Sequence, residues 1–238
     1  MDTRTLTEYG TSPVFSLLQI CDPYFPIGAY TQSFGLETYV QKGIVHDASS
    51  TEQYIRSFLN DNFLFNDLLA VKLSWEYADK QELDNLCSLN QILTAAKAAR
   101  EIRNASLKLG ARFIKILETV LGENHLFHEF VKSCRNEGPG VNYSMAFGLC
   151  ARLFDVNKND ALAALSYGTA SSIINNCAKL VPISQKDGQK ILFASHALLM
   201  ALLARVESLT LEDIGVCATG FDIRAMQHER LYTRLYIS

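Results

Sequence analysis

Apolar side chains recur along most of this chain at the spacing of amphipathic helices. In residues 97–121, one face collects Ile102, Leu109, Phe113, Ile116, Leu117 and Val120 at ~100° per residue. In residues 49–65, one face collects Tyr54, Ile55, Phe58, Leu59 and Phe63. Alternation with a period of two, bounded by hairpin dipeptides, is not evident. The pattern predicts an all-α fold of about nine or ten helices.

Polar residues spaced three apart indicate where helices should begin. The expected start pairs are Ser49 with Glu52, Asn157 with Asp160, Ser184 with Asp187, and Thr210 with Asp213. Residues 185–206 are apolar nearly all round, which predicts a central, buried helix. The last helix should carry one apolar stripe, formed by Ile214, Cys217, Ala218, Phe221 and Ala225.

Few breakers interrupt the helical pattern. Residues 134–142 are the only candidate linker, and they are too short to require two domains. We therefore expect one helical domain over residues 1–238. Residues 1–12 are polar and are expected to be disordered unless a partner orders them.

Composition favours a folded protein of a reducing compartment. The chain is 48% hydrophobic, and its net charge of -3 argues against a nucleic-acid or anionic-membrane partner. Six dispersed cysteines show no zinc-site spacing, which is typical of buried thiols in the cytoplasm. No apolar signal segment follows Met1, and residues 191–204 are too short to span a bilayer. These features predict a cytoplasmic protein.

Motifs for catalysis and cofactor binding are missing from the sequence. It contains no phosphate-binding loop, no nucleophile elbow and no His-Glu-x-x-His, so we expect no catalytic residue, cofactor or metal site. Weak metal-ligand spacings remain at His125 with His128 and at His228 with Glu229. Lys108, Arg112 and Lys115 share a helix face, which is either solvated or faces an acidic partner. From residues alone, a helical interaction protein is favoured.

The segment Leu231–Ser238 departs from an ordinary polar chain end. It holds two tyrosines, two leucines, an isoleucine and an arginine, which would form an exposed apolar patch if left in water. Tyrosine and arginine are frequent anchors of protein interfaces. We therefore expect residues 229–238, the C-terminal tail, to dock on the domain itself or on a partner.

Three segments resemble the UreF family of urease accessory proteins. They are residues 17–37, which contain Phe25-Pro26-Ile27-Gly28-Ala29-Tyr30 and Gly35-Leu36-Glu37, residues 181–190, and residues 222–238. One difference is Gln32, where family members often have histidine. A metal or proton role at that position is therefore not expected, whereas a packing or partner role is.

The resemblance implies an all-helical, dimerising scaffold without enzymatic activity of its own. It implies partnership with UreD (also called UreH) and with the GTPase UreG, in the delivery of nickel to apo-urease. Two alternatives remain open. One is a metallochaperone that binds nickel through its own His125, His128 or His228 and cysteines, and the other is an uncharacterised helical hydrolase.

The resemblance also suggests where partners bind. Pro26 and Gly28 should form a rigid turn, after which Thr31 or Ser33 caps a helix with Glu37 in its first turns. We expect Tyr30 to pair with Arg234, and this junction to recruit UreG. The predicted partner-binding residues are Tyr30, Gln32, Ser33, Glu37, Arg234, Leu235 and Tyr236. Gly188 and Gln189 are the predicted dimer interface.

Overall fold

The computed structural model describes residues 12–216 and 218–238, which contain helices and no strand. The α-helices are α1 (Pro13–Cys21), α2 (Leu36–Gln41), α3 (Ala48–Ser57), α4 (Leu69–Asp79), α5 (Leu83–Ala96), α6 (Arg100–Leu117), α7 (His125–Glu137), α8 (Tyr143–Leu153), α9 (Lys158–Leu180), α10 (Gln185–Ala194), α11 (His196–Val206) and α12 (Thr219–His228). Short 3₁₀ turns form η2 (Ala29–Thr31) and η4 (Leu211–Asp213). A π-helix, η3 (Phe58–Leu68), joins α3 to α4 without a break.

The predicted all-α class is confirmed. When α3, η3 and α4 are counted as one helix, and α10 with α11 as another, the described residues contain ten helices, as expected. Of the segment predicted to be disordered, residues 1–11 lie outside the described residues, and Ser12 precedes α1.

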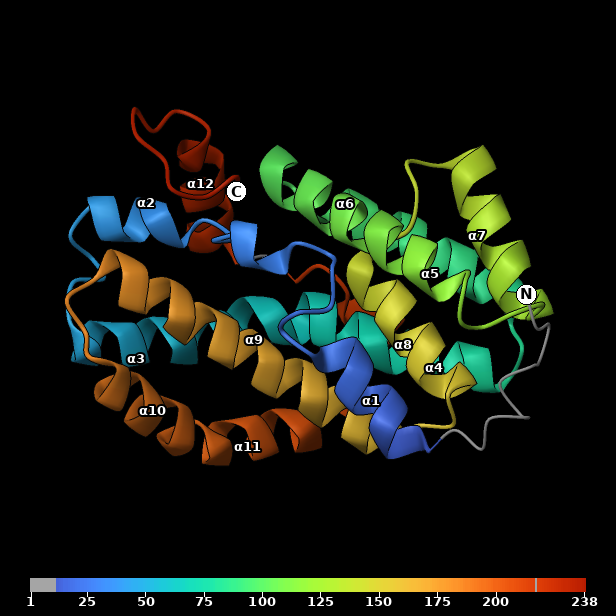
Figure 1. Cartoon of the computed structure of the whole chain (residues 1–238). Coiled ribbons are helices and arrows are strands. Elements are labelled where there is room, and N and C mark those ends of the chain that lie inside the picture. The colour runs from blue at the N-terminus through green and yellow to red at the C-terminus, as the bar shows by residue number, and fades with distance from the viewer. Residues whose placement is uncertain (1–11, 217) are drawn as a thin grey trace.

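One hydrophobic core joins the helices. Helix α8 lies at its centre, because every residue from Ser144 to Ala151 is buried and the helix packs mainly against α4 and α6. Figure 1 shows α9 with α1 on the near side, α10 and α11 along the lower edge, and α5, α6 and α7 at the upper right. Helix α12 and the C-terminal tail lie at the opposite end from α7, next to α2.

Helix starts were predicted with mixed success. Asn157 and Ser184 each accept a main-chain N–H from the residue three positions on, which confirms both caps. The Ser49 start is wrong: Asp47 caps α3 and accepts the Ser50 N–H at 2.8 Å. Asp47 comes earlier in the chain and is as good a capping residue as serine, so the helix begins before Ser49. The Thr210 box forms, but it opens only η4.

The last helix therefore begins later than expected, at Thr219. The described residues between η4 and α12, which are 214–216 and 218, are not helical, so these described residues do not continue one helical stripe. Of the residues predicted for that stripe, Cys217 lies outside the described residues.

Residues 185–206 do not form a central, buried helix. They lie at the surface as α10 and α11, which meet at Ser195, whose hydroxyl donates to the Ile191 carbonyl at 2.8 Å. Phe193 and Met200 are 75% and 67% exposed. By length and composition alone, Gln185–Val206 is long and apolar enough to cross a membrane. About a third of its most apolar stretch is buried inside the protein. When a helix has apolar residues on all of its faces, the sequence does not show which face packs against the rest of the chain and which is left exposed.

Candidate partner-binding site

Two glycines shape the chain that leads into α2. Gly28 and Gly35 have φ angles of 79° and 84°, in the left-handed region that favours glycine. A β-carbon on Gly28 would collide with the Arg112 guanidinium, which donates to the Ile27 carbonyl at 2.9 Å. A β-carbon on Gly35 would lie 3.1 Å from the Cα of Ala225 in α12. The glycines therefore let the turn bind α6 and let α2 approach α12.

The predicted cap of this helix was wrong. Gly35 occupies the position before α2, and no side chain caps its first turn. The Thr31 hydroxyl instead donates to the Gly28 carbonyl at 2.9 Å, and Ser33 binds the C-terminal tail. Glu37 does lie in the first turn of α2, as expected, where the helix dipole favours a negative charge.

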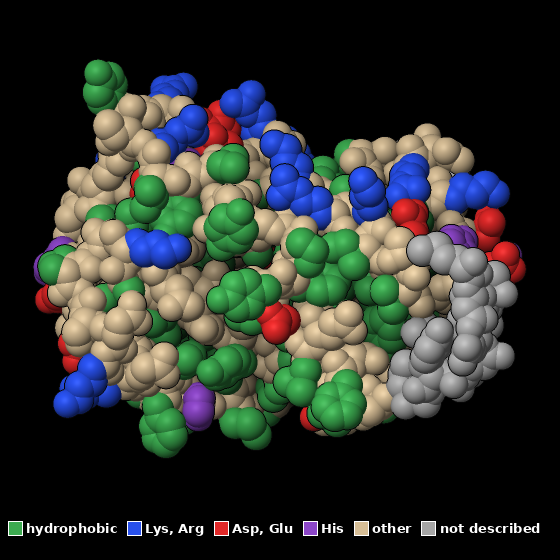
Figure 2. All heavy atoms as spheres, in the orientation of Figure 1, with side chains coloured by type: hydrophobic (Ala, Val, Ile, Leu, Met, Phe, Trp, Pro, Cys, Tyr) green, Lys and Arg blue, Asp and Glu red, His purple; other side chains and the backbone are tan. Residues whose placement is uncertain are grey.

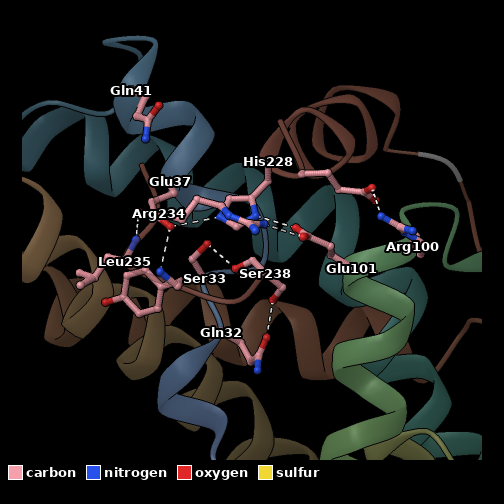
Figure 3. Close-up of polar contacts among 12 residues, drawn as sticks. Gln32, Ser33, Glu37, Gln41, Arg100, Glu101, His228, Arg234, Leu235 and Ser238 are labelled. Carbon is pink, nitrogen blue, oxygen red and sulfur yellow. Dashed lines mark hydrogen bonds and ion pairs between the residues drawn. The ribbon is translucent and has the colours of Figure 1, made fainter. Parts of the chain in front are cut away.

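Glu37 is a buried carboxylate that holds the C-terminal tail. Its Oε1 accepts the Leu235 N–H at 2.6 Å, and its Oε2 accepts the Tyr236 N–H at 3.1 Å. The same Oε2 lies 3.1 Å from Nε2 of His228 in α12. Only 4% of Glu37 is exposed. One side chain thus joins α2, α12 and two consecutive tail amides (Figure 3).

A second carboxylate completes this cluster from α6. Glu101 Oε2 lies 2.6 Å from Nδ1 of His228, and its Oε1 accepts from the Arg234 guanidinium at 2.7 Å. His228 is fully buried, so both of its ring nitrogens face carboxylates away from water. We call Glu37, Glu101, His228 and Arg234 the tail clamp.

The end of the tail is bound by the turn that precedes α2. The N–H and the hydroxyl of Ser33 both donate to the main-chain oxygen of Ser238 at 2.6 Å. The Ser238 hydroxyl donates to Gln32 Oε1 at 2.6 Å, and the Ile237 N–H donates to the Thr31 carbonyl at 2.9 Å. Through these bonds the end of the tail is held against its own domain.

The expected pair of Tyr30 with Arg234 does not form. Arg234 binds Glu101 instead, because a carboxylate is a stronger partner for a guanidinium than a phenol is. Tyr30 is 70% exposed on η2. The tail does lie against the turn, as predicted, but serine and main-chain groups hold it there.

Arg234 holds the tail through Glu101, and the other six predicted partner-binding residues separate into two groups. Gln32, Ser33, Glu37 and Tyr236 are buried, and they hold or fill the space beneath the tail. Tyr30 and Leu235 point to solvent, as do two residues that the prediction missed, Tyr232 and Ile237. We call Tyr232, Leu235 and Ile237 the outward face of the tail. They are 101%, 63% and 58% exposed.

Tyr236 anchors the tail from the inner side. It is 5% exposed, and the Lys179 ammonium lies 6.0 Å from its ring centre. Burial raises the pKa of Tyr236, and the nearby Glu37 carboxylate raises it further. The phenol therefore stays neutral at physiological pH. The residues on either side of it, Leu235 and Ile237, are exposed.

The predicted dimer residues lie on α10. Gly188 is buried, and a β-carbon there would lie 3.0 Å from Ile174 of α9, so the close approach at this glycine is intramolecular. Gln189 is exposed, one helical turn before Phe193 on the same face.

Two residues of the clamp escaped the sequence prediction. Glu101 was not singled out in the sequence, and His228 was named only for a weak metal-ligand spacing. His228 lies 127 positions from Glu101 and 191 positions from Glu37, so no local spacing could reveal that these residues contact one another. The only sequence signal was a histidine on a helix that immediately precedes the tail.

The weak metal-ligand spacings do not form a cluster. No group of three or more His, Cys, Asp or Glu side chains in the described part of the chain could hold a metal ion. His228 has both nitrogens engaged by carboxylates, and His128 Nε2 lies 2.8 Å from the Gly122 carbonyl. The metallochaperone alternative gains no support from this geometry.

Comparison with known proteins shows the family. The UreF family model matches residues 45–196, which is more than half of the chain. The chain belongs to the UreF family of urease accessory proteins. A relative from Actinobacillus pleuropneumoniae, named urease accessory protein UreF, is 39% identical and covers 94% of this chain and 98% of its own length. Proteins of the same name from Haemophilus influenzae (strain PittGG) and Bacillus sp. (strain TB-90) are 37% and 32% identical.

The match with one relative covers nearly the whole chain. The Haemophilus influenzae UreF covers 99% of this chain and 97% of its own length, although the family model ends before α12 and the tail. Membership of the UreF family implies a role in urease maturation. The family is one of accessory proteins rather than of enzymes.

Proposed function

We propose that this UreF-family chain is a maturation scaffold that assembles with UreD (UreH) and the GTPase UreG to deliver nickel to apo-urease. In this proposal the chain acts as a single domain in the cytoplasm, and it performs no catalysis. It regulates nickel delivery by binding the nucleotide states of UreG with different affinities, since only a difference in affinity can couple the two events.

The observation that carries the proposal is the outward face of the tail. Tyr232, Leu235 and Ile237 are exposed apolar or aromatic side chains on a segment whose main chain is bound by buried polar groups. A free apolar patch is normally buried by a partner, and a rigid one loses less conformational entropy on binding. Tyr30 stands on the η2 turn that binds the end of the tail.

Replacing Leu235 and Ile237 together by glutamate tests this surface. Burial of an aliphatic side chain contributes roughly 1.5–3 kcal/mol, so the double variant is expected to bind the UreG–UreD pair at least about 100-fold more weakly. Binding is measured by titration with purified partners. Both side chains point outward, so the circular dichroism spectrum and melting temperature should match those of the unsubstituted protein.

A matched control uses Ile92→Glu, at another exposed isoleucine on α5. This variant is expected to bind the partners normally. Undiminished binding by the Leu235, Ile237 double variant would contradict the assignment of the tail as the partner-binding surface.

A second surface fits the expected homodimer. Figure 2 shows hydrophobic side chains gathered over the face that carries α1, α9, α10 and α11. Among the exposed hydrophobic residues of these helices are Phe15 and Leu18 on α1, Tyr167 on α9, Phe193 on α10 and Met200 on α11. Gln189 borders this face on α10, whereas Gly188 supports it from within by letting α10 pack against α9. We propose that a second copy of the chain covers this face.

The dimer proposal is tested with Phe193→Glu and Met200→Glu in one variant. Light scattering after gel filtration should show the mass of a dimer for the unsubstituted protein and of a monomer for the variant. Gly188→Leu is not a suitable test, because it would disturb the contact with Ile174 inside the chain. A monomer before substitution, or a dimer that survives it, would argue against this face.

A further inference from the structure

We propose that one proton shared by Glu37, His228 and Glu101 keeps the C-terminal tail docked, which makes His228 a positioning residue for the outward face. The link from this proton to partner binding rests on the proposed function. The link from this proton to tail docking rests on the geometry of the clamp alone, and the experiment separates the two.

The argument begins with the hydrogen bonds that His228 makes. A neutral imidazole has one N–H donor and one acceptor nitrogen, and an ionised carboxylate can only accept. The two ring nitrogens of His228 face two different carboxylates, at 2.6 and 3.1 Å. Neutral histidine and two ionised carboxylates together provide only one donor for these two contacts. Both contacts can be hydrogen bonds only if the cluster binds one further proton.

The position of that proton does not change the argument. It can lie on His228 as an imidazolium, or on one of the two carboxyl groups, and the number of bound protons is the same. When it is lost, an unprotonated nitrogen faces a carboxylate oxygen in a buried site. Lone pairs that face each other away from water are strongly unfavourable.

The tail depends on the same two carboxylates. Glu37 accepts the main-chain N–H groups of Leu235 and Tyr236, and Glu101 binds the Arg234 side chain. Any movement that separates His228 from Glu37 or Glu101 therefore displaces tail contacts as well. Retention of the proton favours the docked tail, and its loss favours release.

The surrounding charges do not replace this proton. On the α6 and α12 side, Arg100 is bound to Glu229 at 2.5 Å. Elsewhere on α12, Arg224 lies over the Tyr39 ring of α2 at 5.9 Å. The tail contributes Arg234, which is bound to Glu101. The charged groups in direct contact with His228 are Glu37 from α2 and Glu101 from α6, and Arg234 of the tail binds Glu101. The further titratable or charged groups named on these elements are Tyr39, Arg100, Arg224 and Glu229, which contact one another.

The direction of the pH dependence follows from the proton count. The docked tail requires the bound proton, so docking is complete at the lower pH and weakens as the pH rises and the cluster loses that proton.

Hydrogen exchange measures tail docking without any partner. The amides of Leu235 and Tyr236 are followed between pH 6 and pH 9, and each rate is divided by its intrinsic rate at that pH. Their protection is expected to fall by at least about 10-fold across this range, while the amide of Phe147 in the central helix α8 keeps its protection. Constant protection of the two tail amides would overturn the proposal.

Glu101→Gln provides a rescue that a merely structural role for His228 would not give. The glutamine NH₂ can donate to Nδ1 of a neutral His228, and its carbonyl oxygen can still accept from Arg234. Tail protection in this variant should therefore become independent of pH. If it falls with pH as steeply as in the unsubstituted protein, the shared proton is not the cause.

Titration of UreG–UreD against the chain at pH 6 and pH 9 separates this inference from the proposed function. If tail protection falls and partner binding falls with it in the unsubstituted protein but not in Glu101→Gln, both proposals are supported. If tail protection falls and partner binding does not, the shared-proton clamp stands and the tail is not the partner surface.

Discussion

Replacing Glu37 by alanine is expected to release the C-terminal tail and to lower the free energy of unfolding by about 3 kcal/mol. The change leaves the Leu235 and Tyr236 amides and His228 without their buried acceptor. Removal of one partner from a buried charged pair typically costs about 3–5 kcal/mol, because the other group stays buried and unpaired. Urea unfolding followed by circular dichroism measures the stability, and hydrogen exchange at the two amides measures the release.

Gln41→Ala is the matched control for this prediction. Gln41 also lies on α2 and also binds the tail, through a 2.8 Å hydrogen bond to the Thr233 carbonyl, but this bond is exposed to solvent. Its loss should cost no more than about 1 kcal/mol. If Glu37→Ala retained the protection of Leu235 and Tyr236, the clamp would not be what holds the tail.

The substitution Gly148→Ala is expected to destabilise the core by about 3 kcal/mol. Gly148 lies where α8 crosses α4, and a β-carbon there would collide with the Ser74 hydroxyl and come within 2.6 Å of the Val71 carbonyl oxygen. The carbonyl belongs to a helix and cannot move aside, so α4 and α8 must separate. For a domain of this size the melting temperature should fall by roughly 6–12 °C, which differential scanning calorimetry measures.

Gly168→Ala tests whether this effect comes from the close approach or from glycine itself. Gly168 lies in α9, and a β-carbon there would meet no atom within 4 Å. Alanine at an open helical position should stabilise the protein by up to about 1 kcal/mol. An equal loss of stability in both variants would mean that the α4–α8 contact is not the reason for glycine at position 148.

Local patterns predicted the elements that depend on local physics. Helix α6 followed from its apolar face, and the caps of α9 and α10 followed from Asn157 and Ser184, since an amphipathic period and a cap are encoded within a few residues. The start of α3 was wrong because Asp47 and Ser49 are both good capping residues, and the sequence alone does not rank them.

Contacts between distant segments could not be predicted in the same way. The apolar composition of the tail predicted docking on the domain or on a partner, but the predicted contact of Arg234 with Tyr30 was wrong, because Arg234 binds Glu101. Glu37 lies 198 positions from Leu235, and neither residue has a pattern that points to the other. Residues 185–206 failed for a related reason, because apolar residues on all sides do not reveal that one face lacks a neighbour within the chain.

In the proposed scaffold role, one set of residues holds the tail and a different set contacts the partner. Buried polar groups from α2, α6 and α12 fix the main chain of the tail, which leaves Tyr232, Leu235 and Ile237 free to contact another protein. A variant of the clamp should therefore impair tail docking and partner binding together, whereas a variant of the outward face should impair partner binding alone.

The most direct test of this account is a hydrogen-exchange footprint of the chain with and without the UreG–UreD pair, at a pH where the tail is docked. The account predicts that the partners increase the protection of residues 229–238 and of the η2 turn that carries Tyr30. Binding that protects other surfaces and leaves the exchange of these two segments unchanged would contradict it.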